Sequence, residues 1–516
     1  MPPDSRRRIG WAWCQNGELF PHIHSVAIDT MASSKPSFSL PVVAAEDYRH
    51  AVPGEMWELR PVSITGPIEY RSSPRDDSAE AITRLAEISM QTPVDYPSVS
   101  DAILAGDHVA FAVDPNVPRV AEVLEGAIKV ARACEAARVS IVLWPEASDA
   151  CYQSLSQRFH NIPPDDEASD NAQTLPSTPD EMLINVSRHS PRDRRELRYV
   201  AADADAEAIY LARDLVDADF TIPIVAARAV DAIERLDKTG VFPMFADSST
   251  VHRFQNTSSR ETSEGSANEV GWLLGVQLLI MVSADAAGSV ARILTGTPDA
   301  IRNELDTLHT EKGSDTNESE TRPTSELVVA ALDGDANVQT WPNVARAVIA
   351  ASRHLEGDGT IVVWSRLTES PGPQWLKELS GNAERSPGQE DGDSEDELAS
   401  ALAVQHRDDF SDAADQTDED EDADEPADAD SQPGSGEYAN WSMDRVLAKK
   451  LADLLSSYRV LLHSELSDVD VETLGMGVIA SEEELRRLGA GFQGAGVLRA
   501  AQFHDGSVSR FDTPSA

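Results

Sequence analysis

The chain has 516 residues, of which 41% are hydrophobic, and a formal net charge of −46 at pH 7. This length allows two or three domains with sizeable cores, whereas the acidic surface should repel nucleic acid and anionic lipid, so we expect neither as a partner and no membrane association. Three cysteines are too few for a disulfide framework, and no apolar run is long enough to span a membrane, so we expect a cytoplasmic protein.

The N-terminal region, residues 1–31, is expected to be disordered or an extension of the gene model, with Met31 as an alternative start to Met1. Residues 32–254 are predicted to form a first α/β domain. In it, "HVAFAVD" reads as a strand that ends at Asp114 and leads through a turn into a helix with apolar residues at helical spacing. The continuous apolar run "VSIVLW" is typical of a strand in a parallel sheet that is covered on both faces.

The polar stretch at 255–269 is predicted to be a linker, and residues 270–516 a second α/β domain. Two strand-like runs, "VGWLLGVQLLIMVSA" and "SVARILTG", are expected to pair and to open this domain. A βαβ unit follows, from "ELVVAAL" through a helix to "GTIVVWS". An insertion at 385–437 interrupts the domain, and it is expected to be disordered because about 20 acidic residues crowd there.

These elements predict an α/β fold of two domains with mostly parallel sheets and a cleft between them. In open α/β sheets, ligands bind at the carboxyl ends of the strands, which makes the turn at Asp114 a candidate site. The sequence "GAGFQG" at 489–494 matches a dinucleotide pattern but follows a helix instead of a strand, so we interpret it as a glycine-rich turn. The pair His22 and His24 has no further ligands nearby in the sequence, and we expect no metal site.

The order of the segments resembles that of the lactate racemase family, whose members carry a nickel-pincer nucleotide. "GDHVAFAVDPNVPRVAEVLEGAI" is similar to the strand–turn–helix of that family, and "RHSPRDRRELRYVA" is similar to its His-x-Pro segment. "LLGVQLLIMVSADAAGSVARILTGTPDAI" looks like the strand pair that opens the second domain of the family, and the βαβ unit looks like its C-terminal one. The resemblance covers residues from about 105 to about 381 and resumes at about 440.

The resemblance implies a 2-hydroxy-acid racemase in which histidines act as acid and base, an arginine binds the carboxylate, and a lysine and a histidine hold the cofactor. Carried over position by position, Asp114 matches the turn of the family, but Val117 stands at the arginine position. "WPEASD", after the next strand, has no histidine, and the loop that would tether the cofactor has no counterpart. In the C-terminal unit Trp341 matches an aromatic residue, Ala345 replaces a lysine, and Arg346 lies one place away from it.

We therefore predict a divergent, non-catalytic or ligand-binding relative of this family, with a degenerate active site and no cofactor. The alternative is a nickel-pincer-dependent racemase or epimerase of a 2-hydroxy acid that uses a rearranged site, so both an enzyme and a binding protein stay open at this point. A third hypothesis is an acidic scaffold that acts through residues 390–437.

A small carboxylate is the ligand that we expect in the cleft. The candidate catalytic residues are Asp114 and His189, the histidine of "SRHSPRD". The residues expected to line the cleft are Asn116, Arg119, Trp341 and Arg346. Of these, Arg119 and Arg346 are the candidate cations for the ligand, because a guanidinium matches the planar geometry of a carboxylate. Helix N-terminal amides near Asn116 could add to them.

Overall fold

The structure is a computed structural model of the full chain, and it divides into two units, Met1–Leu40 and Pro41–Ala516. In the first unit it describes an antiparallel pair of strands, β1 (Trp11–Trp13) and β2 (Leu19–Pro21). The described residues of the second unit are 55–59, 77–161, 182–202, 206–228, 237–256, 270–311, 324–383, 443–492 and 494–504. The rest of the predicted N-terminal region 1–31 with His22 and His24, residues 257–269 of the predicted linker, and the acidic insertion at 385–437 lie outside the described residues.

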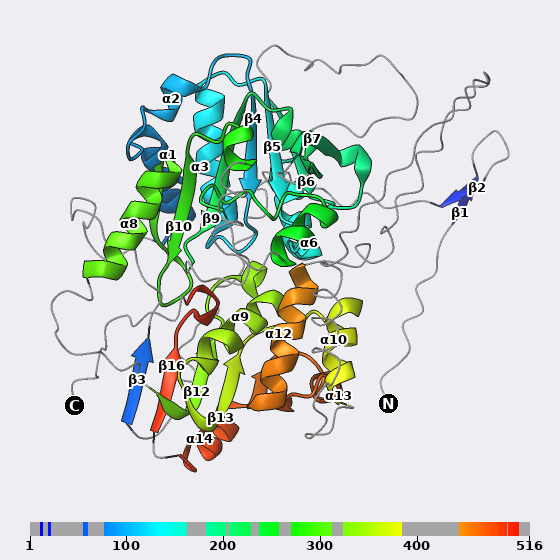
Figure 1. The fold of residues 1–516 in the computed structure, drawn as a ribbon. Coiled ribbons are helices and arrows are strands. Elements are labelled where there is room, and N and C mark those ends of the chain that lie inside the picture. The colour runs from blue at the N-terminus through cyan, green and yellow to red at the C-terminus, as the bar shows by residue number, and fades with distance from the viewer. Residues whose placement is uncertain are drawn as a thin grey trace, which may run out of the picture. The chain divides into compact units, whose positions relative to one another are not determined.

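The first sheet of the second unit has six strands in the order β11-β10-β9-β4-β5-β6 (Figure 1). The strands are β4 (His108–Val113), β5 (Arg138–Leu143), β6 (Leu183–Arg188), β9 (Phe220–Ala226), β10 (Leu279–Ala284) and β11 (Val290–Gly296). Neighbouring strands run parallel, except that β11 pairs antiparallel with β10. The predicted strands "HVAFAVD" and "VSIVLW" are confirmed as the adjacent parallel strands β4 and β5.

Helices cover the first sheet (Figure 1). The helices of this half are α1 (Ala79–Gln91), α2 (Val99–Ala102), α3 (Val120–Ala133), α4 (Asp149–Phe159), α5 (Arg213–Val216), α6 (Ser248–Asn256) and α8 (Pro298–Glu311). Val109, Phe111 and Val113 of β4 pack in one buried cluster with the apolar faces of α1 and α3. The two helices approach closely because Gly126 of α3 has no side chain, and a Cβ there would lie 2.4 Å from the carbonyl oxygen of Thr83.

The second sheet has six parallel strands in the order β15-β14-β13-β12-β16-β3. The strands are β3 (Glu55–Leu59), β12 (Ser325–Ala331), β13 (Leu355–Trp364), β14 (Arg459–His463), β15 (Gly477–Val478) and β16 (Gly494–Leu498). The helices of this half are α9 (Trp341–Ser352), α10 (Pro373–Ala383), α12 (Met443–Ser457), α13 (Asp468–Thr473) and α14 (Glu482–Gly489). The predicted C-terminal βαβ unit is confirmed as β12–α9–β13.

The two sheets share a hydrophobic core. Ala110 and Ala112 of β4 belong to the same buried cluster as Val344 and Val348 of α9 and Leu447 of α12. This apolar packing withdraws the region between the sheets from water, so a polar side chain that lies there needs a partner inside the protein.

Two strands or strand pairs join a different sheet from the one expected from their place in the sequence. The pair β10 and β11 was expected to open the second domain, but β10 pairs with β9 and thereby extends the first sheet. Strand β3 comes before all strands of the first sheet in sequence, yet it pairs with β16 at the edge of the second. A polar stretch such as 255–269 indicates exposure, but it does not determine which sheet the next strand joins, because strand pairing is non-local.

The remaining described elements lie outside the two large sheets. Strands β7 (Leu197–Ala202) and β8 (Ala208–Ala212) form an antiparallel pair. "GAGFQG" joins the end of α14 to the start of β16, the order opposite to that of a dinucleotide fingerprint, which agrees with the interpretation as a turn.

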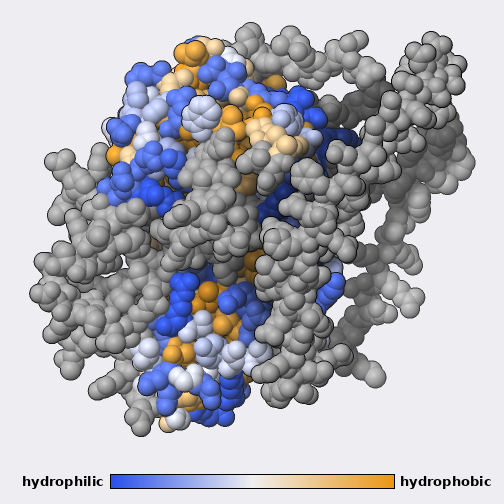
Figure 2. Space-filling model, in the orientation of Figure 1, coloured by the Kyte–Doolittle hydropathy of each residue, from blue (hydrophilic) through white to orange (hydrophobic). Residues whose placement is uncertain are grey.

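The visible surface mixes hydrophilic and hydrophobic residues (Figure 2). The most exposed large hydrophobic side chains, Leu104, Val469 and Trp272, come from separate parts of the chain. Single apolar side chains of this kind are ordinary on protein surfaces. Among the described residues, the helices lack the combination of length and apolarity needed to cross a membrane.

Candidate functional site

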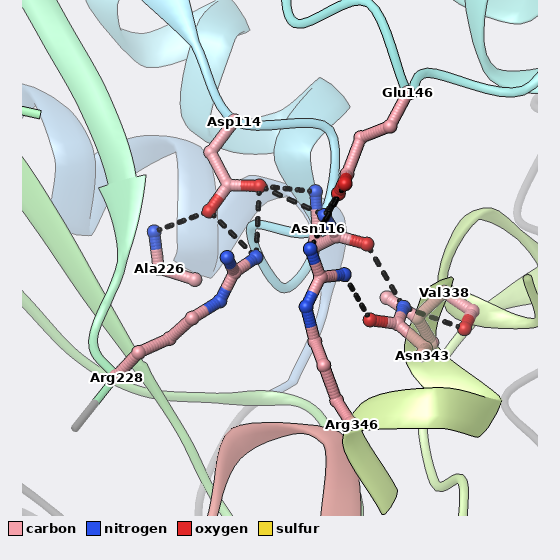
Figure 3. Close-up of polar contacts among 8 residues, drawn as sticks. All are labelled: Asp114, Asn116, Glu146, Ala226, Arg228, Val338, Asn343 and Arg346. Atoms are coloured by element: carbon pink, nitrogen blue, oxygen red, sulfur yellow. Dashed lines mark hydrogen bonds and ion pairs between the residues drawn. The ribbon is translucent and has the colours of Figure 1, made fainter. Parts of the chain in front are cut away.

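The candidate site is a buried cluster of charges where the carboxyl end of β4 faces α9 (Figure 3). Asp114 follows β4 directly and is fully buried. Its Oδ1 accepts hydrogen bonds from the backbone N–H of Asn116 at 2.9 Å and from Nη2 of Arg228 at 3.1 Å. Its Oδ2 accepts from the backbone N–H of Ala226 at 3.2 Å and lies 2.9 Å from the same Nη2. Burial raises the pKa of Asp114, and the Arg228 guanidinium opposes this rise.

A second ion pair joins the two halves. Glu146 comes from the turn after β5, and Arg346 comes from the middle of α9. Nη2 of Arg346 lies 3.0 Å from Oε1 and 2.9 Å from Oε2 of Glu146. Only 8% of the Arg346 side chain and 4% of the Glu146 side chain are exposed, so water screens this pair little.

Two asparagines connect the ion pairs. The Nδ2 group of Asn116 donates to Oδ1 of Asp114 at 3.0 Å and to Oε1 of Glu146. Nδ2 of Asn343 donates to Oδ1 of Asn116 at 2.8 Å, and Oδ1 of Asn343 accepts from Nη1 of Arg346 at 2.8 Å. The network therefore runs from Arg228 on one side to Arg346 on the other through hydrogen bonds alone (Figure 3).

A third carboxylate interacts electrostatically with the second pair. Asp444, at the start of α12, accepts a hydrogen bond from the Trp375 side chain. Burial raises the pKa of Asp444 to about 6, the charge of Glu146 adds to the rise, and Arg346 opposes it. The pKa of Asp444 thus lies close to neutral pH.

His189, the other predicted catalytic residue, lies elsewhere. It follows β6, and its Nε2 is 3.0 Å from the carbonyl oxygen of Ala246. Its ring packs against Phe245 with 5.9 Å between the ring centroids. Burial lowers the pKa of His189 to about 4, so the imidazole is neutral at pH 7 and its Nε2–H donates to Ala246.

The four residues expected in the cleft fall into two groups. Asn116 and Arg346 belong to the cluster. Arg119 directs its guanidinium to Oε2 of Glu122 at 3.2 Å and to the carbonyl oxygen of Asp77. Trp341 donates through Nε1 to the carbonyl oxygen of Glu369 at 2.9 Å. These contacts of Arg119 and Trp341 lead away from the ion pairs.

Four members of the cluster were not identified as site residues from the sequence: Glu146, Arg228, Asn343 and Asp444. Arg228 lies two residues after β9, at the same carboxyl edge of the sheet as Asp114, so the reasoning applied to β4 could have found it. Its guanidinium lies 5.2 Å from the ring centroid of Trp144, a cation–π distance. Asn343 lies three residues before Arg346 on α9, which is the spacing of one helical face.

The described cluster contains neither the histidine nor the lysine that the resemblance implies for a nickel-pincer nucleotide (Figure 3). Among the described residues, His, Cys, Asp and Glu side chains form no group of three that could hold a metal ion. The buried imidazole of His189 is engaged with Ala246, and Lys238 pairs with Asp299 at 2.8 Å instead of facing the cluster.

The comparisons with known proteins support the fold. No protein-family model and no curated protein matches the sequence. Among solved structures, the lactate racemase apoprotein from Thermoanaerobacterium thermosaccharolyticum aligns with a TM-score of 0.51 and 10% identity, over 83% of this chain and 92% of that one. A protein from Thermotoga maritima aligns with a TM-score of 0.51 and 9% identity, over 84% of this chain and 99% of that one. The predicted two-sheet α/β fold of the lactate racemase type is thus confirmed, and identities this low show the fold alone.

Proposed function

We propose that the chain is a non-catalytic binding protein with a lactate-racemase-like fold, and that it binds a small carboxylate at Arg346. The observation that carries this proposal is the buried ion pair in which Arg346 already holds a carboxylate, that of Glu146, with Nη2 within 3.0 Å of both oxygens. A ligand carboxylate in the place of Glu146 would find the same charge-assisted hydrogen bonds.

The surroundings of Arg346 favour this exchange over a purely structural pair. Glu146 lies in a turn after β5, and a turn can move without disrupting the sheet. Arg346, in contrast, is fixed by α9 and by Asn343, which accepts from its Nη1. The guanidinium is therefore the pre-organised partner and the Glu146 carboxylate the exchangeable one.

The same contacts argue against catalysis by the two predicted catalytic residues. Both oxygens of Asp114 accept hydrogen bonds from backbone N–H groups and from Arg228, so this carboxylate would have to break an ion pair before it took a proton. His189 is engaged with Ala246. A general base must reach the proton that it removes to within hydrogen-bond distance.

One observation favours the alternative, an isomerase of a 2-hydroxy acid. The carboxyl group of Asp444 interacts electrostatically with Arg346 and has a pKa of about 6, which suits a base that works near neutral pH. In this alternative, Arg346 would hold the substrate carboxylate and Asp444 would take the proton of its hydroxyl group.

Racemisation assays separate the two proposals. The protein is produced together with the enzymes that make the nickel-pincer cofactor, desalted, and incubated with L-lactate, and D-lactate is followed by chiral chromatography. We expect no D-lactate above the level of an Asp114→Ala variant. Nickel-dependent turnover above that blank would contradict the non-catalytic proposal and support the isomerase.

Calorimetry tests the binding site itself. L-lactate and longer 2-hydroxy acids are titrated into the wild type and into an Arg346→Lys variant, which keeps the positive charge but loses the planar geometry of the guanidinium. We expect binding at least about tenfold weaker in the variant, since charge-assisted pairs of this kind contribute about 1.5–3 kcal/mol. Arg119→Lys is the matched control, because its contacts are with Glu122 and Asp77. Equal affinity in all three proteins would remove Arg346 from the site.

A further inference from the structure

The indole of Trp144 carries a buried hydrogen-bond donor without an acceptor. Trp144 follows β5 directly, and its side chain is fully buried. Its Nε1–H makes no hydrogen bond within the part of the chain that the structure describes. An indole N–H can only donate, and a buried donor without an acceptor is costly, so buried tryptophans usually have a partner. The Nε1–H of Trp144 therefore marks a place where an acceptor oxygen would be stabilised.

Trp144 lies at the candidate site. The guanidinium of Arg228, which is 2.9 Å from the Asp114 carboxylate, lies over the face of the indole, 5.2 Å from the ring centroid. A cation over the face of the ring leaves the Nε1–H at the ring edge available to donate. The indole also belongs to the same buried cluster as Ala345 of α9, the residue next to Arg346. It is therefore part of the junction at which the two ion pairs meet.

The turn after β5 connects the indole with the exchangeable carboxylate. A backbone hydrogen bond of 3.1 Å closes residues 144–147 into a four-residue turn, with Trp144 in the first position and Glu146 in the third. Nδ2 of Asn116 lies within hydrogen-bond distance of the carboxylates of both Asp114 and Glu146, so the two ion pairs are close neighbours. A ligand carboxylate that takes the place of Glu146 therefore binds beside the turn that carries the indole.

We propose that Trp144 is a specificity-determining residue, and that its Nε1–H donates to a second oxygen of the ligand, on the carbon next to the carboxylate. This inference rests on the proposed function and names the ligand class of the same site, which is 2-oxo and 2-hydroxy acids in preference to plain carboxylates. Because the indole only donates, the ligand needs an acceptor at this position and no hydrogen of its own. A carbonyl oxygen meets this requirement as well as a hydroxyl group does.

The other donors of the site are used by the ligand carboxylate. When it replaces Glu146, it takes over the hydrogen bonds that Glu146 accepts from Arg346 and Asn116. The indole then remains as the donor for the second oxygen. A site with a buried donor discriminates against an analogue that lacks the acceptor, because the donor is then left without a hydrogen bond. For a single neutral hydrogen bond we expect a preference of about three- to tenfold.

Calorimetry at pH 7 on the full chain tests this with three acids of similar size: pyruvate, L-lactate and isobutyrate. They carry a carbonyl oxygen, a hydroxyl group and a methyl group, respectively, on the carbon next to the carboxylate. We expect the wild type to bind pyruvate and L-lactate about three- to tenfold more tightly than isobutyrate. A Trp144→Phe variant, which keeps an aromatic ring but has no N–H, should bind all three acids about as weakly as the wild type binds isobutyrate.

Trp364→Phe is the matched control. Trp364 is also a buried tryptophan at the end of a strand, β13, but it belongs to a different hydrophobic cluster and stacks on His463 with 3.8 Å between the ring centroids. This variant should keep the order of affinities of the wild type. A general effect of losing a buried indole would change both variants alike, whereas loss of the proposed hydrogen bond changes the ratio of affinities in Trp144→Phe alone.

The possible results are distinct. A preference that persists in Trp144→Phe, or that is lost equally in Trp364→Phe, overturns the assignment to Trp144. Two outcomes need no variant. If the wild type binds L-lactate tightly but pyruvate as weakly as isobutyrate, the ligand hydroxyl group donates, and the proposal is overturned. Equal affinity of the wild type for all three acids overturns the selectivity and leaves the proposed function in place, whereas absence of binding by all three removes the proposed function and this inference with it.

Discussion

The ion pair between Glu146 and Arg346 should be asymmetric, so that loss of the arginine costs more stability than loss of the glutamate. The change that tests this is a pair of single variants, Arg346→Met and Glu146→Gln, together with the double variant. Methionine fills a similar volume without charge, and glutamine keeps the shape of glutamate and a carbonyl oxygen that can accept from Asn116.

The expected magnitudes follow from which charges remain. Without Arg346, the buried Glu146 carboxylate has lost its cation and lies near Asp444, so the free energy of unfolding should fall by about 3–5 kcal/mol. Without the charge of Glu146, Arg346 still donates to Asn343 and has Asp444 nearby, so the loss should be about 1–3 kcal/mol. The double variant should lose less than the sum of the two, because no orphaned carboxylate remains at position 146.

Urea-induced unfolding of the full chain at pH 7, followed by circular dichroism, measures these differences from the midpoints at a constant slope. The control is Arg445→Met, which breaks a more exposed ion pair with Glu378 on the surface of the second half and should cost at most about 1 kcal/mol. If Arg346→Met costs no more than this control, the pair is not a buried link between the halves. If Glu146→Gln costs as much as Arg346→Met, Asp444 does not act as a substitute partner.

Three further predictions concern the stability of the fold. Deletion of residues 390–432 with a short Gly/Ser replacement should leave the melting temperature within a few degrees, because like charges crowd in this stretch and loop closure depends weakly on length; loss of the cooperative transition would contradict it. Asp335→Asn should stabilise the protein by up to about 3 kcal/mol at pH 7 and hardly at pH 4. Burial raises the pKa of Asp335 to about 6, so ionisation of this group opposes folding as the pH rises from about 4. Equal effects of the substitution at both pH values in urea titrations would refute this. Burial lowers the pKa of His189 to about 4, so the free energy of unfolding of the wild type should fall by up to about 3 kcal/mol as the pH falls from about 6.5 to 4. The His189→Gln variant, which can still donate to Ala246, should not show this decrease in the same titrations.

The elements that could be predicted from the sequence are those specified by local patterns. The apolar run of β5, the alternation of β4 and the helical spacing of α3 depend on residues that are near one another in the chain, so the strand–turn–helix at Asp114 was predicted correctly. The sheet to which β10 and β11 belong was not predicted correctly. Membership of that sheet depends on pairing such as that of Ile280 with Ile224, and these residues are far apart in sequence.

The same distinction applies to the site. Asp114 and Asn116 could be predicted as site residues because ligands bind at the carboxyl ends of the strands in open α/β sheets. Both residues lie in the cluster. The partner of Arg346 could not be predicted, because Glu146 is 200 residues away in the sequence and the pair forms only where the two halves meet. The position of Arg119 at the start of a helix predicted that its guanidinium would be available to a ligand. In the structure, Arg119 has a backbone φ of 53°, and its guanidinium donates to Glu122 and to the carbonyl oxygen of Asp77.

The position of β3 also limits how the protein can be divided. Residues Glu55 to Leu59 pair in register with Gly494 to Leu498, so a recombinant fragment that starts after Gly296 would contain every other strand of the second sheet but would leave one side of β16 unpaired. Open edges of this kind invite self-association. A synthetic peptide that covers β3 could pair with β16 by strand complementation and restore the native edge strand. We expect the C-terminal half to bind this short segment of the N-terminal sequence in trans, which would allow a split version of the protein that reassembles on mixing.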